Sequence, residues 1–108
     1  MGAMVTILYK SDSITESDAR DLAENVQKNI LLTLNTKDVF VYNFEVKDTV
    51  AADPIEVFVQ INKLKVPEPN LFLEDLSNHL SRWKNQTNFS HTINLNVVPV
   101  EWHSKFAI

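Results

Sequence analysis

The sequence contains no cysteine, one glycine and two arginines, and each scarcity excludes a class of function. Without cysteine there is no disulfide framework, thiol nucleophile, iron–sulfur cluster or cysteine zinc site. The one glycine, Gly2, lies at the start of the chain. Loops that wrap phosphates need glycine where the backbone approaches the ligand closely. A P-loop and a dinucleotide-binding fingerprint are therefore both excluded.

Long apolar runs and excess positive charge are also missing. No run approaches the roughly 18 residues that would span a membrane, and no export signal is recognisable. Fourteen acidic and ten basic residues leave a formal charge of −4, which argues against a nucleic-acid partner. The three histidines, His79, His91 and His103, do not stand at metal-ligand spacing. We therefore expect a cytoplasmic protein with no metal, no cofactor, and no membrane or nucleic-acid partner.

The length and composition are those of one globular domain. The chain has 108 residues, of which 44% are hydrophobic and 22% charged. Met1, Gly2 and Ala3 look like a short remnant of recombinant expression before a native start at Met4. We accordingly expect a single domain over 4–108, with residues 1–3 outside the fold.

The first half of the chain is predicted to form a strand, a helix and a second strand. Residues 4–9 are an apolar strand, and the hydroxyls of Ser13 and Thr15 both fit a helix-capping box. Apolar residues then recur at helical spacing up to Asn35, a suitable left-handed C-cap; they are Ala19, Leu22, Ala23, Val26, Ile30 and Leu34. A second strand is expected over 39–47, followed by a turn over 48–54.

The second half repeats this order. Residues 55–62 alternate as a strand, and Asn70 is a plausible N-cap for the next helix. The buried stripe of that helix is predicted from Leu73, Leu76, Leu80 and Trp83, with Phe72 at its edge. A polar loop over 85–90 and a strand over 92–98 follow. Trp102 is expected either to cover its own sheet or to anchor a neighbouring subunit.

The strand over 39–47 has two distinct faces, and we interpret its aromatic face of Phe40, Tyr42 and Phe44 as the core face. The opposite face of the sheet would then be semi-polar and suited to contact other subunits. Its predicted members are Val39, Val41, Asn43, Glu45, Phe58, Gln60, Asn62, Asn94 and Asn96. An alternative reading is that Phe40, Tyr42, Phe44 and Phe58 form a base-stacking surface like that of RNA-recognition domains. The acidic balance argues against this alternative.

Two strand–helix–strand units predict an α+β fold. Such units pack as right-handed parallel crossovers in nearly all cases. The duplicated β-α-β unit therefore predicts a four-stranded sheet with both helices on one face, a two-layer sandwich.

This arrangement resembles the tautomerase superfamily, which includes 4-oxalocrotonate tautomerase and macrophage migration inhibitory factor. Within it, the sequence looks most like a small bacterial family with that fold. The resemblance is carried by Met4–Lys10, the aromatic strand Val39–Lys47, Asp53–Val59 and Ile93–Pro99. It covers nearly the whole chain in layout, and its motifs are mainly hydrophobic patterns.

The resemblance implies a homotrimer with ligand pockets between neighbouring subunits. In active members the residue after the initiator methionine is a proline, whose amine moves a proton between carbon and oxygen. In this sequence Val5 occupies that position. Lys37 is the cation near the implied pocket, and Tyr42 follows it along the same strand. Any ligand would be a planar keto or enol acid held near these three residues.

Three functions follow from these observations. The first is a tautomerase-like homotrimer that lacks the catalytic proline and is not an efficient enzyme. The second is a ferredoxin-like protein-interaction module with the same element order but antiparallel strand pairing. The third is a keto–enol tautomerase that uses the Val5 amine as its base, since an α-amine titrates at about 7.7 to 8.0.

Overall fold

Strands and helices follow one another in the predicted order. The computed structural model describes residues 2–47 and 54–101. The elements are β1 (Ala3–Lys10), α1 (Glu16–Leu34), β2 (Val39–Val46), β3 (Ile55–Asn62), α2 (Pro69–Thr87) and β4 (Ile93–Val100). Most of the predicted turn over 48–54, together with Trp102 and His103, lies outside the described residues.

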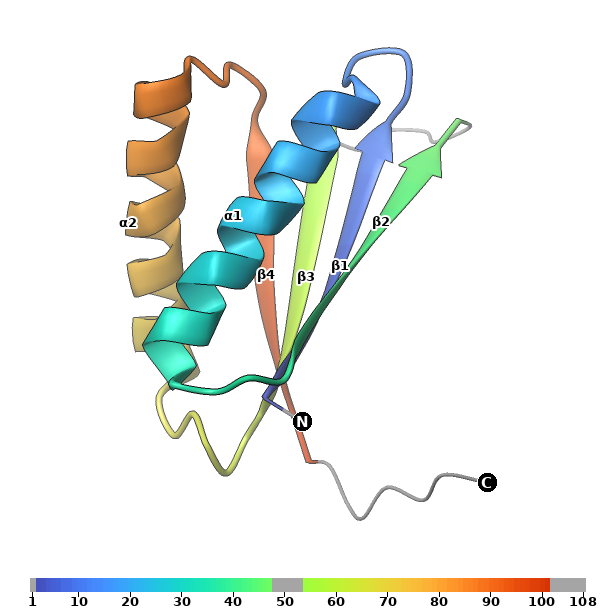
Figure 1. The fold of residues 1–108 in the computed structure, drawn as a ribbon. Coiled ribbons are helices and arrows are strands. Elements are labelled where there is room, and N and C mark those ends of the chain that lie inside the picture. The colour runs from blue at the N-terminus through green and yellow to red at the C-terminus, as the bar shows by residue number, and fades with distance from the viewer. Residues whose placement is uncertain (1, 48–53, 102–108) are drawn as a thin grey trace.

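The four strands form one mixed sheet in the order β2-β1-β3-β4. β1 pairs parallel to β2, β3 pairs parallel to β4, and the two central strands pair antiparallel. Both helices cover the same face of this sheet, and the other face is left open (Figure 1). The predicted α+β two-layer sandwich is therefore confirmed. The alternative prediction of antiparallel pairing, as in a ferredoxin-like fold, is wrong for two of the three strand pairs. β1 joins β2 in parallel through the crossover helix α1, and β3 joins β4 in parallel.

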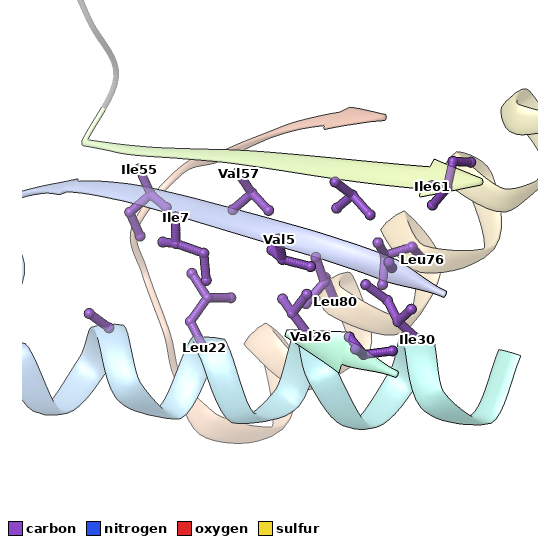
Figure 2. Packing of buried hydrophobic residues seen from close by; sticks show 14 of the residues in the cluster. Val5, Ile7, Leu22, Val26, Ile30, Ile55, Val57, Ile61, Leu76 and Leu80 are labelled. Atoms are coloured by element: carbon purple, nitrogen blue, oxygen red, sulfur yellow. The ribbon is translucent and has the colours of Figure 1, made fainter. Parts of the chain in front are cut away.

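The core lies between the sheet and the helices. Alternate residues of β1 and β3 point into it and meet the apolar stripe of α1, as Figure 2 shows. Its fully buried members include Val5, Ile7, Leu22, Val26, Ile30, Ile55, Val57, Val59 and Ile61. β1 and β3 are the two central strands of the sheet. This position suits them because their helix-facing side chains are aliphatic and buried.

Helix α1 begins and ends at residues with capping geometry. The Thr15 hydroxyl accepts a hydrogen bond of 3.0 Å from the Asp18 backbone amide, which identifies Thr15 as the N-cap in preference to Ser13. At the other end Asn35 is left-handed, with φ of 48°, and its amide donates to the Leu31 carbonyl. Both caps satisfy backbone groups that the helix leaves unpaired.

Helix α2 begins two residues earlier and ends later than expected. Pro69 is its first residue and Glu68 its N-cap, so the prediction of Asn70 as the cap is wrong. Proline suits this position because it has no amide hydrogen to lose. The helix continues to Thr87 and ends at the left-handed Asn88. Phe72 lies in the core, not at the edge as predicted.

Strand β1 begins at Ala3, one residue before the expected start. The Ala3 side chain is fully buried, and its backbone lies opposite Val39 and Ile61. Gly2 and Ala3 both donate backbone hydrogen bonds of 3.0 Å to the Asp38 carbonyl. Two of the three residues that we expected outside the fold are therefore paired in it.

Neither helix of the described residues is long and apolar enough to cross a membrane.

Candidate functional site

The open face of the sheet carries an aromatic surface. Phe40, Tyr42 and Phe44 of β2 are 44%, 49% and 51% exposed, and Phe58 of β3 is 37% exposed. Strand register places these side chains in rows across the sheet. One row reads Tyr42, Thr6, Phe58, Asn96, and the two rows beside it read Phe40, Met4, Gln60, Val98 and Phe44, Leu8, Glu56, Asn94. We call these twelve residues the open face.

The two faces of β2 are reversed relative to the sequence prediction. Val39 is buried and Val41 half-buried against the helical layer, whereas the aromatic residues between them point to the open face. Helix α1 fixes this orientation through polar contacts. The Asn43 side chain donates to the Ala19 carbonyl at 3.2 Å, and the Gln27 side chain donates to the Val39 carbonyl at 3.0 Å. Phe40, Tyr42 and Phe44 are therefore not core residues.

Uncharged groups dominate the open face. Among its twelve residues Glu56 alone is charged, and it accepts a hydrogen bond of 3.0 Å from Asn94; Lys10 lies beside this surface at the end of β1. One negative charge, with one positive charge beside it, gives this face no net positive field. The aromatic residues do lie where a base-stacking surface would place them. Phosphate contacts in nucleic-acid binding need clustered cations, and no such cluster accompanies these aromatic residues on the four described strands.

The structure does not bring Val5 and Tyr42 to one surface. Val5 lies opposite Val41 on β2 and Val59 on β3, and its side chain is fully buried on the helical side. Tyr42 lies one residue further along β2, on the open face. A single chain therefore cannot place both side chains around one ligand.

Lys37 lies at the end of the sheet where β1 and β2 both begin. It is exposed and directly precedes Asp38, whose carbonyl receives the two amides at the start of β1. The backbone is tight there: a Cβ atom on Gly2 would lie 2.6 Å from Cγ2 of Thr36 and 2.9 Å from the Asp38 carbonyl oxygen. Lys37 is thus near the start of β1 and two residues before β2.

At the opposite end of the same strands Tyr9 is a buried phenol. Burial raises the pKa of Tyr9 above its ordinary value, and the nearby carboxylates of Glu45 and Glu16 raise this pKa further. All three effects disfavour the phenolate. Tyr9 is therefore a proton-holding core residue at neutral pH and not a nucleophile.

A concave region lies between the first half of α1 and the end of α2. It has a volume of about 410 Å³, and its lining includes Asp18, Asp21, Trp83, Phe89 and His91. The Phe89 ring packs against Trp83 at 4.9 Å and against His91 at 5.2 Å, and His91 Nε2 lies 3.7 Å from Asp18 Oδ2. Among residues 2–47 and 54–101, no three His, Asp or Glu side chains are grouped so that they could hold a metal ion.

Comparison with known proteins shows similarity in structure alone. No family model matches the sequence, and no curated protein matches it. The crystal structure of native Ps01740 has a TM-score of 0.65 at 12% identity, covering 91% of this chain and 94% of that chain. A probable enzyme from the thermophilic fungus Aspergillus fumigatus has a TM-score of 0.63 at 13% identity, covering 94% and 77%.

A third similar structure identifies the fold. FG41 malonate semialdehyde decarboxylase, inhibited by 3-bromopropiolate, has a TM-score of 0.57 at 15% identity, covering 97% of this chain and 91% of that chain. That decarboxylase is a member of the tautomerase superfamily. The chain therefore has the tautomerase-like fold that its sequence resembles. Identities of 12–15% establish this fold and carry no activity over to the chain.

Proposed function

We propose that this protein is a homotrimer of tautomerase-like fold that lacks the proline catalyst and binds a small planar keto or enol acid between subunits without efficient turnover. The observation that carries the proposal is the aromatic open face. Four aromatic side chains that are more than a third exposed, with almost no charge among them, form a surface suited to burial against further copies.

Weak catalysis follows from the residues at the start of β1. Val5 replaces the family's proline, and its side chain is fully buried on the helical side. A valine backbone inside a strand has no basic amine to accept a proton. An exposed lysine, Lys37, remains near the strand end to pair with a ligand carboxylate. These features support ligand binding in preference to proton transfer.

The oligomeric state is tested first by light scattering. We expect a mass near three times the 12.4 kDa chain mass. Phe44→Glu places a carboxylate on the open face and should yield monomers, because burying an unpaired charge is costly. Leu71→Glu is the matched control, since Leu71 is also more than half exposed but lies on α2. A monomeric parent chain, or equal effects of the two substitutions, would refute the proposed assembly.

Ligand binding is tested separately with phenylpyruvate by calorimetry. Lys37→Ala should weaken binding about five-fold through loss of one partly screened charge pair. Lys65→Ala is the control, because Lys65 is also exposed but lies in the β3–α2 connection. Equal effects of the two substitutions on binding would mean that Lys37 is not part of the binding site.

Catalysis by the Val5 amine is tested by phenylpyruvate ketonisation. We expect near-background rates both for the full chain and for a chain that begins at Val5. A rate well above background in the shortened chain alone would establish the Val5 amine as the base and contradict weak catalysis.

A further inference from the structure

The concave region between α1 and the end of α2 has a wall of aromatic rings, and we call this region the aromatic hollow. The rings are those of Trp83, Phe89 and His91, which pack in sequence with centroid distances of 4.9 and 5.2 Å. The Phe89 amide donates a hydrogen bond of 3.1 Å to the Lys84 carbonyl, so the end of α2 holds this ring in place. Because the faces of aromatic rings carry negative charge density, such a wall attracts a cation.

The facing wall of the aromatic hollow belongs to α1 and is acidic. Its carboxylates are those of Asp18, Asp21 and Glu24, spaced three residues apart, and Lys28 is the one lysine or arginine in the lining. Asp18 contacts His91. Within the described part of the chain, the carboxylates of Asp21 and Glu24 make no ion pair and accept no hydrogen bond. Two carboxylates in the lining are therefore available to a ligand.

The end of α2 adds further negative potential. The first half of α1 and the end of α2 lie at the same end of the molecule (Figure 1). Thr87, the last residue of α2, and its C-cap Asn88 both line the aromatic hollow. The last carbonyls of a helix carry partial negative charge, which favours a cation. The opposite partial charge at the start of α1 is offset by Glu16 and Asp18 in its first turn. Rings, carboxylates and the α2 terminus thus all select positive charge.

The spacing of the carboxylates indicates what kind of cation fits. Among residues 2–47 and 54–101 no three His, Asp or Glu side chains converge as metal ligands would. Asp18 and Glu24 are instead six residues apart, about 9 Å along the axis of α1. An extended aliphatic diamine of about six carbons has a comparable length. Lys28 lies one turn beyond Glu24 and repels a further ammonium there, which favours a diamine over a longer polyamine.

We propose that the aromatic hollow binds a linear aliphatic diamine along α1. One ammonium group lies near Asp18 and the other near Glu24, and the methylene chain between them packs against the rings of Trp83 and Phe89. The volume of about 410 Å³ leaves room for such a molecule. The aromatic hollow is formed by the helices and the α2–β4 connection, away from the open face, so diamine binding does not depend on the proposed homotrimer.

The test is an amide NMR titration of the full chain with hexane-1,6-diamine, and n-hexylamine at equal ionic strength is the control ligand. We expect a dissociation constant on the order of 1 mM for the diamine, about five-fold below that of the monoamine, because exposed charge pairs each contribute little. The shifts should be concentrated in residues 18–28 and 83–91. Equal affinities of the two amines, or shifts spread over all acidic segments of the chain, would overturn the proposal.

A matched pair of variants tests the acidic wall. Glu24→Gln removes one charge at nearly constant size and should weaken diamine binding about three-fold. Glu74→Gln makes the same change at an exposed glutamate of α2 outside the lining and should leave binding unchanged. Both sites are exposed, and the amide spectra establish that both variants fold. Equal losses in the two variants would mean general charge attraction and would overturn the site.

The ring wall is tested in the parent chain, so that no packing is disturbed. At saturating diamine we expect nuclear Overhauser effects between the ligand methylene protons and the ring protons of Trp83. The absence of these effects, while the amide shifts persist, would mean that the diamine does not lie against the rings and would overturn the proposed binding mode.

Discussion

Val5 and Tyr42 lie one register step apart on adjacent strands, yet their side chains leave the sheet on opposite faces. Val5 pairs with Val41 and points to the helices, whereas Tyr42 pairs with Thr6 and points to the open face. Side chains alternate along a strand, so this separation is fixed by the backbone. Val5 therefore acts in the core, and Tyr42 belongs to the surface that we propose meets other subunits.

The role of Val5 in the core can be measured directly. Val5→Ala removes two methyl groups from a fully buried site and should lower the free energy of unfolding by about 2 kcal/mol. Leu32→Ala shortens a side chain that is 71% exposed on α1, away from the open face, and should cost under about 1 kcal/mol. Urea denaturation of both variants provides the comparison. Similar losses at the two positions would contradict the placement of Val5.

The N-cap of α1 distinguishes two hydroxyls that the sequence leaves equivalent. Thr15→Ala should lower the free energy of unfolding by about 1 kcal/mol, because the Asp18 amide loses its acceptor. Ser13→Ala is the control, since the Ser13 hydroxyl donates to the exposed Asp12 carboxylate and caps no helix amide. Thermal unfolding measures both losses. A larger loss at Ser13 than at Thr15 would mean that Ser13, and not Thr15, caps the helix.

Alkaline pH should destabilise the protein through Tyr9. Burial raises the pKa of this phenol in the folded state, so the folded chain holds the proton more tightly than the unfolded chain. The contribution to stability is complete below pH 10, the ordinary tyrosine pKa, and is lost as the pH rises through the higher folded-state pKa.

Urea unfolding between pH 8 and pH 11 tests this expectation. Tyr9→Phe should flatten the alkaline decline, because the substituted side chain has no proton to lose. Tyr42→Phe is the control for a half-exposed tyrosine and should retain the decline of the parent chain. An unchanged slope in Tyr9→Phe would mean that other groups govern alkaline stability.

Residues 2 and 3 should contribute to stability although the sequence suggests that they lie outside the fold. Removing residues 1–3 deletes a buried alanine side chain and two hydrogen bonds to the Asp38 carbonyl. We expect a loss of about 2 kcal/mol in the free energy of unfolding. Chemical denaturation of the full and shortened chains measures it. Equal stability of the two chains would support a domain boundary at Met4.

Most of the fold could be predicted because its periodicity is strong. The apolar stripe of α1 and the alternation in β3 each leave one face of the element that can be buried in the core. Both predictions are confirmed. The N-cap of α2 could not be predicted in the same way, because Pro69 and Asn70 are both favourable at a helix start. The subunit-bordered ligand site around Val5, Lys37 and Tyr42 stays a prediction, since a single chain contains only part of such a site.

The sequence by itself determined the element order, the two-layer architecture and the buried stripe of α1, because these depend on local periodicity and on a strongly favoured crossover geometry. Only the tertiary structure decided which face of β2 is buried. Both faces of that strand are apolar enough to enter a core, and hydrophobicity alone favours Phe40, Tyr42 and Phe44. The space beneath α1 accepts the smaller Val39 and Val41, and Asn43 bonds there to Ala19, so the aromatic residues are left on the open face.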